Sequence, residues 1–170
     1  MRLFLGQFAV IDDLGDIHRR LAPRLIGNWV SKENLHLTLA FLGEVQRAEP
    51  VIDALEGIAP LKRPLPLKGV GLFGHPPLVL FAGVDDPKGE LMRLYRDIHK
   101  RLAFPGSGRR FSPHVTLARI KRLIAADRPI DTAYWDGRRL GNVSPVLSLI
   151  RSRLGPEGPS YETLATWGED

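Results

Sequence analysis

The chain has 170 residues, of which 44% are hydrophobic and 25% are charged, and its formal net charge is +5. This length and apolar content suffice for one domain with a buried core, and the interspersed charges of both signs exclude a disordered chain. The sequence contains no cysteine, which excludes disulfides, thiolate nucleophiles and Cys-ligated zinc or iron–sulfur centres. Arginine supplies 18 of the 24 basic residues. Its planar guanidinium group suits phosphate, so the charge favours anionic partners, although genomic composition produces the same bias.

The N-terminal segment is predicted to be a strand and not a targeting signal. Residues 1–10 form an apolar run that is interrupted by Gln7, lacks a small-residue cleavage site and leads directly into Asp12 and Asp13. No stretch of the sequence approaches the roughly 18 apolar residues that a membrane span needs. We therefore expect a cytoplasmic protein that makes no membrane contact, and we expect it to be a monomer.

Short runs of alternating apolar residues, bounded by turn residues, are interleaved with helical patterns along the whole chain. In chain order they predict a strand over Arg2–Val10, a helix over about Asp13–Leu21, a strand over Leu35–Leu42, a helix over about Ala48–Ile58, strands over Leu65–Phe73 and Leu78–Val84, a helix over about Pro87–Leu102, and strands over Phe111–Ile120, Val143–Arg151 and Tyr161–Trp167. Asp85 and Asp86 offer an N-cap for the third helix, whose apolar spacing is the clearest. This order predicts an α+β fold with antiparallel sheets in a single domain, residues 1–170, and its partial recurrence in the second half suggests an internal duplication.

The same short pattern occurs once in each half of the chain, on a predicted strand. The first copy spans His36–Leu39 (HLTL) and the second spans His114–Leu117 (HVTL). In each copy the histidine and the threonine two residues later point to one face of the strand, while the apolar residues point to the other. A lone histidine of this kind is more often structural than catalytic, but two matches among five histidines arise by chance only about a few times in ten thousand. The duplication favours a functional site built from His36, Thr38, His114 and Thr116.

Two imidazoles and two hydroxyls are the groups that a displacement at phosphorus requires when no metal takes part. The unperturbed pKa of histidine is about 6.5, so one imidazole can be protonated as the general acid while the other is neutral as the general base. Threonine hydroxyls both donate and accept hydrogen bonds, so they can hold nonbridging phosphoryl oxygens without adding charge. The pattern therefore indicates acid–base chemistry on a phosphate ester, with no metal and no cofactor.

The residues around both motifs resemble those of the 2H phosphoesterase superfamily, and within it the bacterial and archaeal RNA 2′,3′-cyclic phosphodiesterases once called 2′-5′ RNA ligases. Besides the paired motifs, the resemblance rests on segments that follow the family's order along nearly the whole chain: Arg2-Leu3-Phe4, Trp29-Val30, Phe41-Leu42-Gly43-Glu44, Gly71-Leu72-Phe73, Phe111-Ser112-Pro113, Ala118-Arg119 and Tyr161. The resemblance implies a bilobal fold. Two antiparallel-sheet lobes with flanking helices would be related by a pseudo-twofold axis around a central cleft, with one His-x-Thr motif in each lobe.

The resemblance also implies a role for each motif residue. His36 would be the proton donor to the leaving oxygen, His114 would be the proton acceptor from water, and Thr38 and Thr116 would bind the phosphate. The substrate would be an RNA or oligonucleotide end that carries a 2′,3′-cyclic phosphate. With these roles, expulsion of the 3′-oxygen would leave a 2′-phosphomonoester.

Further residues are candidates for contacts with such a substrate. Arg119 occupies a place where the family often has a basic residue, but strict alternation puts it on the face opposite His114, so phosphate binding requires a β-bulge or the end of the strand. Aromatic residues suited either to stacking a nucleobase or to the core are Trp29, Phe41, Phe73 and Tyr161. Arginines suited either to an electropositive rim or to an ordinary solvated surface are Arg109, Arg110, Arg138 and Arg139.

Two other features receive structural interpretations. The segment 69–74 matches G-x-G-x-x-G, but it is followed by His75 and two prolines and not by a helix, so we reject a dinucleotide site there. We interpret His75 as a turn residue, and His18 and His99 as solvated residues on helix surfaces.

Other functions stay open at this point. Within the same superfamily the chain could be a 2′-5′ RNA ligase, or a nucleotide cyclic phosphodiesterase with little activity on RNA. An RNA-binding module without catalysis would follow if the His-Thr pairs were structural. A metallohydrolase is the weakest alternative, because two histidines without Asp or Glu in the same motifs make a poor metal-ligand set.

Overall fold

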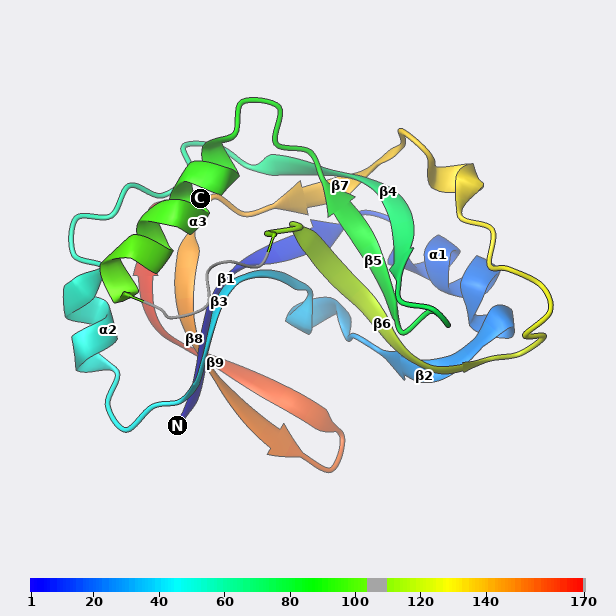
Figure 1. Ribbon diagram of the computed structural model, residues 1–170, viewed down its shortest axis with the longest axis horizontal. Coiled ribbons are helices and arrows are strands. Elements are labelled where there is room, and N and C mark those ends of the chain that lie inside the picture. The colour runs from blue at the N-terminus through cyan, green and yellow to red at the C-terminus, as the bar shows by residue number, and fades with distance from the viewer. Residues whose placement is uncertain (104–109, 170) are drawn as a thin grey trace.

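The computed structural model describes residues 1–103 and 110–169. This part of the chain forms nine strands, three α-helices and three short 3₁₀ turns (Figure 1). The strands are β1 (Arg2–Ile11), β2 (Leu25–Trp29), β3 (His36–Glu44), β4 (Leu65–Phe73), β5 (Val79–Val84), β6 (His114–Leu123), β7 (Arg139–Val143), β8 (Leu147–Gly155) and β9 (Gly158–Trp167). The helices are α1 (Leu14–Leu21), α2 (Glu49–Ala54) and α3 (Glu90–Leu102), and the 3₁₀ turns are η1 (Ala22–Arg24), η2 (Lys32–Asn34) and η3 (Ala133–Trp135).

The strands of the described residues form one hydrogen-bonded sheet in which every pair is antiparallel. Their order is β2-β6-β5-β4-β7-β1-β8-β9, and β3 pairs with both β1 and β6. One group of neighbouring strands consists of β3, β1, β8 and β9, and the other consists of β2, β6, β5, β4 and β7. The groups meet where β7 pairs with β1 and where Leu37 of β3 pairs with Val115 of β6. The predicted α+β class with antiparallel strands is confirmed, and the pseudo-twofold relation between two lobes stays a prediction.

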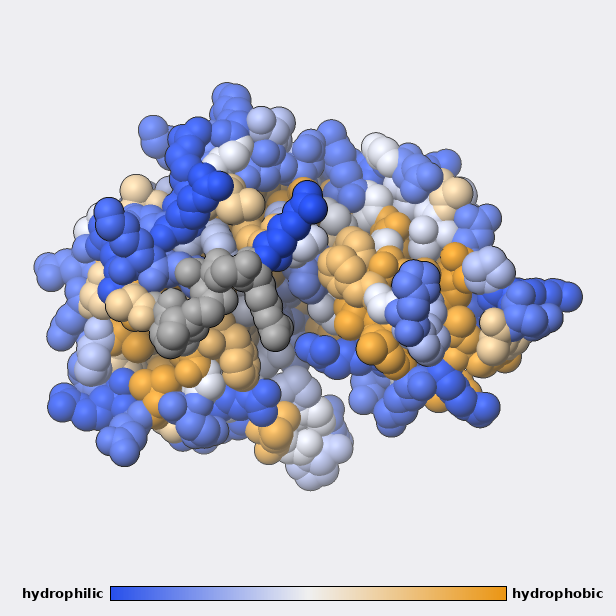
Figure 2. Space-filling view, in the orientation of Figure 1, coloured by the Kyte–Doolittle hydropathy of each residue, from blue (hydrophilic) through white to orange (hydrophobic). Residues whose placement is uncertain are grey.

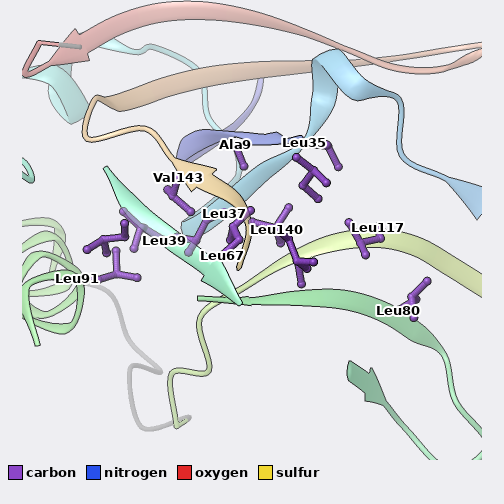
Figure 3. Close-up of a cluster of buried hydrophobic side chains, with 14 of the residues drawn as sticks. Ala9, Leu35, Leu37, Leu39, Leu67, Leu80, Leu91, Leu117, Leu140 and Val143 are labelled. Atoms are coloured by element: carbon purple, nitrogen blue, oxygen red, sulfur yellow. The ribbon is translucent and has the colours of Figure 1, made fainter. Parts of the chain in front are cut away.

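The apolar sides of the two motif strands face a common core. Leu37 and Leu39 of β3 and Leu117 of β6 are buried there, together with Leu91 of α3 (Figure 3). Helices α2 and α3 lie beside the strand group that contains β3 and β8 (Figure 1). Each fully buried leucine stabilises the fold by roughly 1.5–3 kcal/mol, so the inward face of both strands is strongly determined. The histidines and threonines between these leucines must then face the opposite way.

Helix α3 begins about three residues later than its sequence pattern predicts. Gly89 precedes its first residue and adopts a left-handed conformation, with φ of +69°. Asp86 still caps the helix, because its Oδ2 accepts a hydrogen bond of 3.2 Å from the backbone amide of Met92. The predicted apolar face is confirmed, since Leu91, Leu94 and Ile98 are buried.

The predicted strand Val143–Arg151 is confirmed over Leu147–Arg151, which belong to β8, but a break at residues 144–146 separates them from Val143, the last residue of β7. Pro145 lies in the break and has no amide hydrogen for a sheet. The amide of Ser144 instead donates a 2.8 Å hydrogen bond to the carbonyl of Phe8. β7 pairs with the last residues of β1, and β8 pairs with its first residues. The break therefore lets two short strands follow one another along β1.

Strand β2 was not predicted from the sequence. Gly27 and Asn28 lie in its middle, and both residue types are depleted in strands. The strand forms at the edge of the sheet, where it pairs with β6 over Leu25–Trp29. Its pairing with β6 stabilises it, because its own sequence has little preference for a strand.

The surface is mixed in character. Hydrophilic side chains cover much of the periphery in Figure 2, while apolar side chains gather over β4, β5 and β6. Leu78, between β4 and β5, and Ile124, just after β6, are both exposed. None of the helices in residues 1–103 and 110–169 is long and apolar enough to cross a membrane.

Gly141 lets β7 lie directly against β1, and its substitution tests that packing. A β-carbon at this position would collide with the backbone carbonyl of Val10. We expect Gly141→Ala to lower the free energy of unfolding by about 1–3 kcal/mol, the usual cost of overpacking, as measured by urea denaturation. The matched control is Gly15→Ala in α1, where a β-carbon makes only ordinary contacts. This control should raise stability by about 0.5–1 kcal/mol, and equal stability of Gly141→Ala and the parent would contradict the packing.

Candidate active site

Both motif strands contain a β-bulge three residues after the histidine. The pairing of β3 with β1 skips Leu39, and the pairing of β6 with β5 skips Leu117. An extra residue of this kind is left unpaired, and the side chains beyond it change faces. The two strands that carry the His-x-Thr motifs thus share one irregularity at the same place.

The bulge in β6 brings Arg119 to the side of His114. Leu117 and Ala118 are both buried although they are adjacent in sequence, and the exposed Arg119 follows them. Regular alternation would have directed Arg119 to the opposite face. Arg119 instead lines the same cavity as His114. The β-bulge that a phosphate-binding role for Arg119 requires is therefore present.

One cavity of about 820 Å³ is lined by all four motif side chains. Its walls come from β2, β3, β6 and the β8–β9 hairpin, which extends away from the body of the molecule in Figure 1. The side chains that matter for the chemistry are His36, Thr38, His114, Thr116, Arg119 and Tyr161. Ligand sites typically measure about 300–1,000 Å³, so this cavity can hold a nucleotide-sized ligand.

The two histidines are held in the same way by the backbone. His36 Nδ1 lies 2.7 Å from the carbonyl oxygen of Asn34, and His114 Nδ1 lies 2.8 Å from the carbonyl oxygen of Ser112. A carbonyl oxygen only accepts hydrogen bonds, so each Nδ1 must carry the proton. Each neutral imidazole then has Nε2 as its acceptor, and a protonated imidazole has Nε2–H as a donor. In both residues Nε2 is therefore the nitrogen that is available to exchange a proton with a ligand.

Aromatic rings pack around both imidazoles. The ring centroid of His36 lies 4.8 Å from that of Phe4 and 5.2 Å from that of Tyr161. On the other strand group, the ring of His114 lies 4.9 Å from that of Phe73, which itself stacks on a neighbouring phenylalanine of β5. These contacts restrict rotation of the imidazoles. They place Phe73 beside His114 but outside the cavity lining.

Burial and nearby charges change the acidity of two groups in the cavity. Burial lowers the pKa of His36, and the positive charges of Arg119 and His114 lower it further, while the hydrogen bond to Asn34 opposes these effects. Burial raises the pKa of the Tyr161 hydroxyl, although the charges of Arg119 and Arg2 partly oppose this. Tyr161 therefore remains a neutral phenol that can donate a hydrogen bond to a ligand.

Asn34 connects His36 to the hairpin that closes one side of the cavity. Its backbone carbonyl holds His36, and its side-chain Nδ2 donates a 2.9 Å hydrogen bond to the carbonyl of Pro159 in the β8–β9 hairpin. Tyr161 follows two residues after Pro159 and contacts the His36 ring. No sequence pattern marks Asn34 as a site residue, because it acts through its backbone carbonyl and through a side-chain contact 125 residues away.

Comparisons with known proteins identify the family of the chain. The sequence model of the LigT-like phosphoesterase family matches residues 7–81. A curated RNA 2′,3′-cyclic phosphodiesterase from Aeropyrum pernix is 37% identical over 150 residues, which cover 79% of this chain and 82% of the relative. Another from Archaeoglobus fulgidus is 33% identical over 175 residues, covering 96% of this chain and 98% of the relative. The chain belongs to the LigT-like phosphoesterase family.

A solved structure of the family supports the same assignment. The crystal structure of E. coli LigT complexed with 3′-AMP matches this fold with a TM-score of 0.74 at 27% identity, covering 98% of this chain and 96% of LigT. The predicted membership of the 2H phosphoesterase superfamily is thereby confirmed, and the chain is an enzyme of this superfamily.

The aromatic candidates for base stacking fall into two sets. Trp29 and Tyr161 line the cavity, and Trp29 also packs against the ring of His18 at 4.5 Å. Phe41 and Phe73 do not line it. Phe41 is half-exposed beneath the guanidinium group of Arg2, which lies 5.1 Å from its centroid. The structure thus brings two of the four candidates to the cavity that contains the paired motifs.

The three candidate rim arginines that the structure describes, Arg110, Arg138 and Arg139, do not line the cavity. Arg138 lies over the ring of Tyr134, and Arg139 pairs with Asp12 at 3.7 Å. Arg110 is exposed and also absent from the lining. Arg109 lies outside the described residues. Within the described part of this phosphoesterase no three His, Asp or Glu side chains gather closely enough to hold a metal ion.

The predictions for the remaining histidines differ in outcome. His18 and His75 are exposed, in α1 and in the β4–β5 turn, as predicted. The interpretation of His99 as a solvated surface residue is wrong. Its ring is half-buried, and Nε2 lies 2.9 Å from the carbonyl oxygen of Leu39.

The link between Arg119 and His36 can be measured directly. We expect Arg119→Gln to raise the pKa of His36, because the substitution removes a positive charge that disfavours the imidazolium. The pKa should stay below the ordinary histidine value, since burial is the largest cause of its lowering. An NMR titration of the His36 imidazole nitrogens measures it, with Arg2→Gln as the matched control that should leave it unchanged. An unaltered His36 pKa in Arg119→Gln would show that the two groups do not share the cavity as described.

Proposed function

We propose that this phosphoesterase hydrolyses RNA ends that carry a 2′,3′-cyclic phosphate and produces 2′-phosphomonoesters. One observation supports the proposal above all. His36, Thr38, His114 and Thr116 line one cavity, and both imidazoles are oriented by backbone carbonyls so that Nε2 is the reactive nitrogen. The curated relatives from Aeropyrum pernix and Archaeoglobus fulgidus are RNA 2′,3′-cyclic phosphodiesterases.

The proposed reaction is an in-line displacement at phosphorus. Neutral His114 accepts a proton from water at Nε2 as the water oxygen forms its bond to phosphorus. Protonated His36 donates its Nε2 proton to the 3′-oxygen as the phosphorus–3′-oxygen bond breaks. The phosphate stays on the 2′-oxygen, and the two imidazoles have exchanged their protonation states. Proton exchange with solvent restores the starting state.

Three further side chains suit the phosphate oxygens. The hydroxyls of Thr38 and Thr116 each follow a motif histidine by two residues, so they lie on the same face of the strand. Arg119 adds a guanidinium group, which binds phosphate oxygens through charge-assisted hydrogen bonds. Donors held in place before the reaction stabilise the extra negative charge that the phosphoryl group acquires in the transition state.

The proposed acid role of His36 depends on the substrate's charge. In the free enzyme burial lowers the pKa of His36, which favours the neutral imidazole. A bound cyclic phosphate places a negative charge near the ring, and an opposite charge within about 4–6 Å favours the imidazolium. Substrate binding would therefore supply the protonated form that the leaving oxygen requires.

The identity of the product tests the proposal. An oligonucleotide ending in a 2′,3′-cyclic phosphate should be converted to the 2′-phosphomonoester in excess EDTA. A phosphatase specific for 3′-phosphates should release no inorganic phosphate from the product, whereas a non-specific phosphatase should release it. His36→Ala and His114→Ala should each lower the rate by about 10²–10⁴, the usual size of an acid or base contribution, with unchanged circular dichroism spectra.

Three outcomes of the same assay would contradict the proposal. A 3′-phosphate product would require the roles of the two histidines to be exchanged or abandoned. Activity that disappears with EDTA and returns with a divalent ion would indicate metal-dependent chemistry. RNA binding without turnover by the parent enzyme, which survives both alanine substitutions, would indicate a binding module.

The dependence of His36 on bound phosphate gives a separate prediction. Saturating 2′-AMP, a product-like nucleotide, should raise the pKa of His36 relative to the free enzyme, because the phosphate charge stabilises the imidazolium. Adenosine, which lacks the phosphate, is the control and should leave the pKa unchanged. NMR titration of His36 with each ligand makes the comparison. A pKa that falls with 2′-AMP would count against His36 as the proton donor.

A further inference from the structure

A hydrogen bond outside the cavity connects helix α3 to the strand that carries His36. His99 Nε2 lies 2.9 Å from the carbonyl oxygen of Leu39, and since that oxygen only accepts, Nε2–H is the donor. Leu39 is the extra residue of the β3 bulge and directly follows Thr38. The bond therefore holds the backbone at the point where the strand departs from regular geometry.

The bulge in β6 receives an equivalent hydrogen bond from a neighbouring strand. The amide of Val30, the residue after the last residue of β2, donates a 2.9 Å hydrogen bond to the carbonyl oxygen of Leu117. In the described part of the chain β3 has no such neighbour at its bulge, because its pairing with β6 is confined to Leu37. At Leu39 a side chain of α3 thus provides the donor that a main-chain amide provides at Leu117.

His99 also belongs to a stack of rings that reaches the segment before the other motif strand. The ring centroids of His99 and Tyr95 are 4.1 Å apart, and those of Tyr95 and Phe111 are 4.0 Å apart with an interplanar angle of 7°. Phe111 immediately precedes Ser112, whose carbonyl holds His114. Two side chains of α3 therefore contact both motif segments: His99 contacts the carbonyl of Leu39 in β3, and Tyr95 contacts the ring of Phe111, the residue before Ser112.

We propose that His99 is a positioning residue for the reaction. It fixes the β3 bulge, and through the ring stack it fixes the segment before His114, so that Thr38 and both imidazoles keep the separation that the phosphoryl group requires. The proposal rests on the proposed function, and it assigns His99 no contact with substrate, because His99 does not line the cavity. A displacement of about 1 Å caused by a change far from the chemistry can lower a rate on the order of 10²-fold.

Docking of α3 does not depend on His99. Leu91, Leu94 and Ile98 are buried and attach the helix to the core. Loss of the His99 hydrogen bond should therefore alter the bulge and leave the helix in place. This separation allows a test in which activity and stability respond differently.

Two substitutions that differ by one methylene group provide the test. In His99→Gln the amide nitrogen reaches about as far as Nε2 and can donate to Leu39, whereas in His99→Asn it falls short. With a 2′,3′-cyclic-phosphate-ended oligonucleotide, we expect His99→Asn to lower kcat by about 10–100-fold with KM unchanged, and His99→Gln to restore most of kcat. His99→Leu, which fills the space but has no donor, should behave like His99→Asn even if the latter folds poorly.

Controls on the same helix separate positioning from simple destabilisation. Ile98→Val should lower the thermal midpoint while kcat stays at the parental value, and the exposed Arg96→Ala should change neither. Parental kcat in both His99→Asn and His99→Leu would overturn the proposal, as would an equal loss of kcat in Ile98→Val. If the parent itself does not turn over the oligonucleotide, the proposed function fails, which is a different result from active His99 variants.

Discussion

The leucines on one face of β3 and β6 are buried in a single core, so neither strand can shift by one residue without exchanging buried leucine for histidine and threonine. That register constraint directs both motifs toward the same cavity. The bulges at Leu39 and Leu117 change the pairing register, so the side chains that follow them in each strand point to the opposite face. In β6 this change brings Arg119 to the histidine side, and in β3 it leaves Phe41 at the surface. The two His-x-Thr motifs and their bulges are alike, but among the arginines that the structure describes only Arg119, in β6, lines the cavity.

The same arginine has two opposed effects. Its charge suits phosphate oxygens, yet it also disfavours the imidazolium of His36, as burial does. A phosphate bound between Arg119 and His36 would oppose the lowering of the His36 pKa, because its negative charge compensates the guanidinium charge and also stabilises the imidazolium. The positive charge in the cavity thus suits an anionic ligand. When two histidines interact through a bound phosphate, their apparent pKa values belong to the pair and not to either residue.

Much of this architecture follows from local patterns. The apolar run of β1, the alternation in β3, β4, β5 and β6 and the apolar face of α3 predict those elements, because these side chains are buried in the core. The His-x-Thr pairs were identifiable because the pattern occurs twice, and Arg119 was conditional on a bulge that alternation cannot reveal. The edge strand β2 was missed because it exists through its pairing with β6, which a single segment of sequence does not encode. The break at Pro145, in contrast, has a local signal, because a proline inside a predicted strand argues against a continuous strand.

The hydrogen bonds that hold the two motifs explain why the repeated His-x-Thr pattern predicts the candidate catalytic residues but not the residues that hold them in place. Each histidine donates from Nδ1 to the backbone carbonyl of the residue two positions earlier, so this hydrogen bond is a local feature of both motifs. Each bulge needs a donor for its free carbonyl, and here the halves differ: Val30 supplies a backbone amide on one side, and His99 supplies an imidazole on the other. Residues that merely satisfy the backbone can be replaced by any donor of suitable reach, so no common sequence pattern marks them. This is why His99 resembled a surface residue in the sequence although it contacts the strand that carries His36.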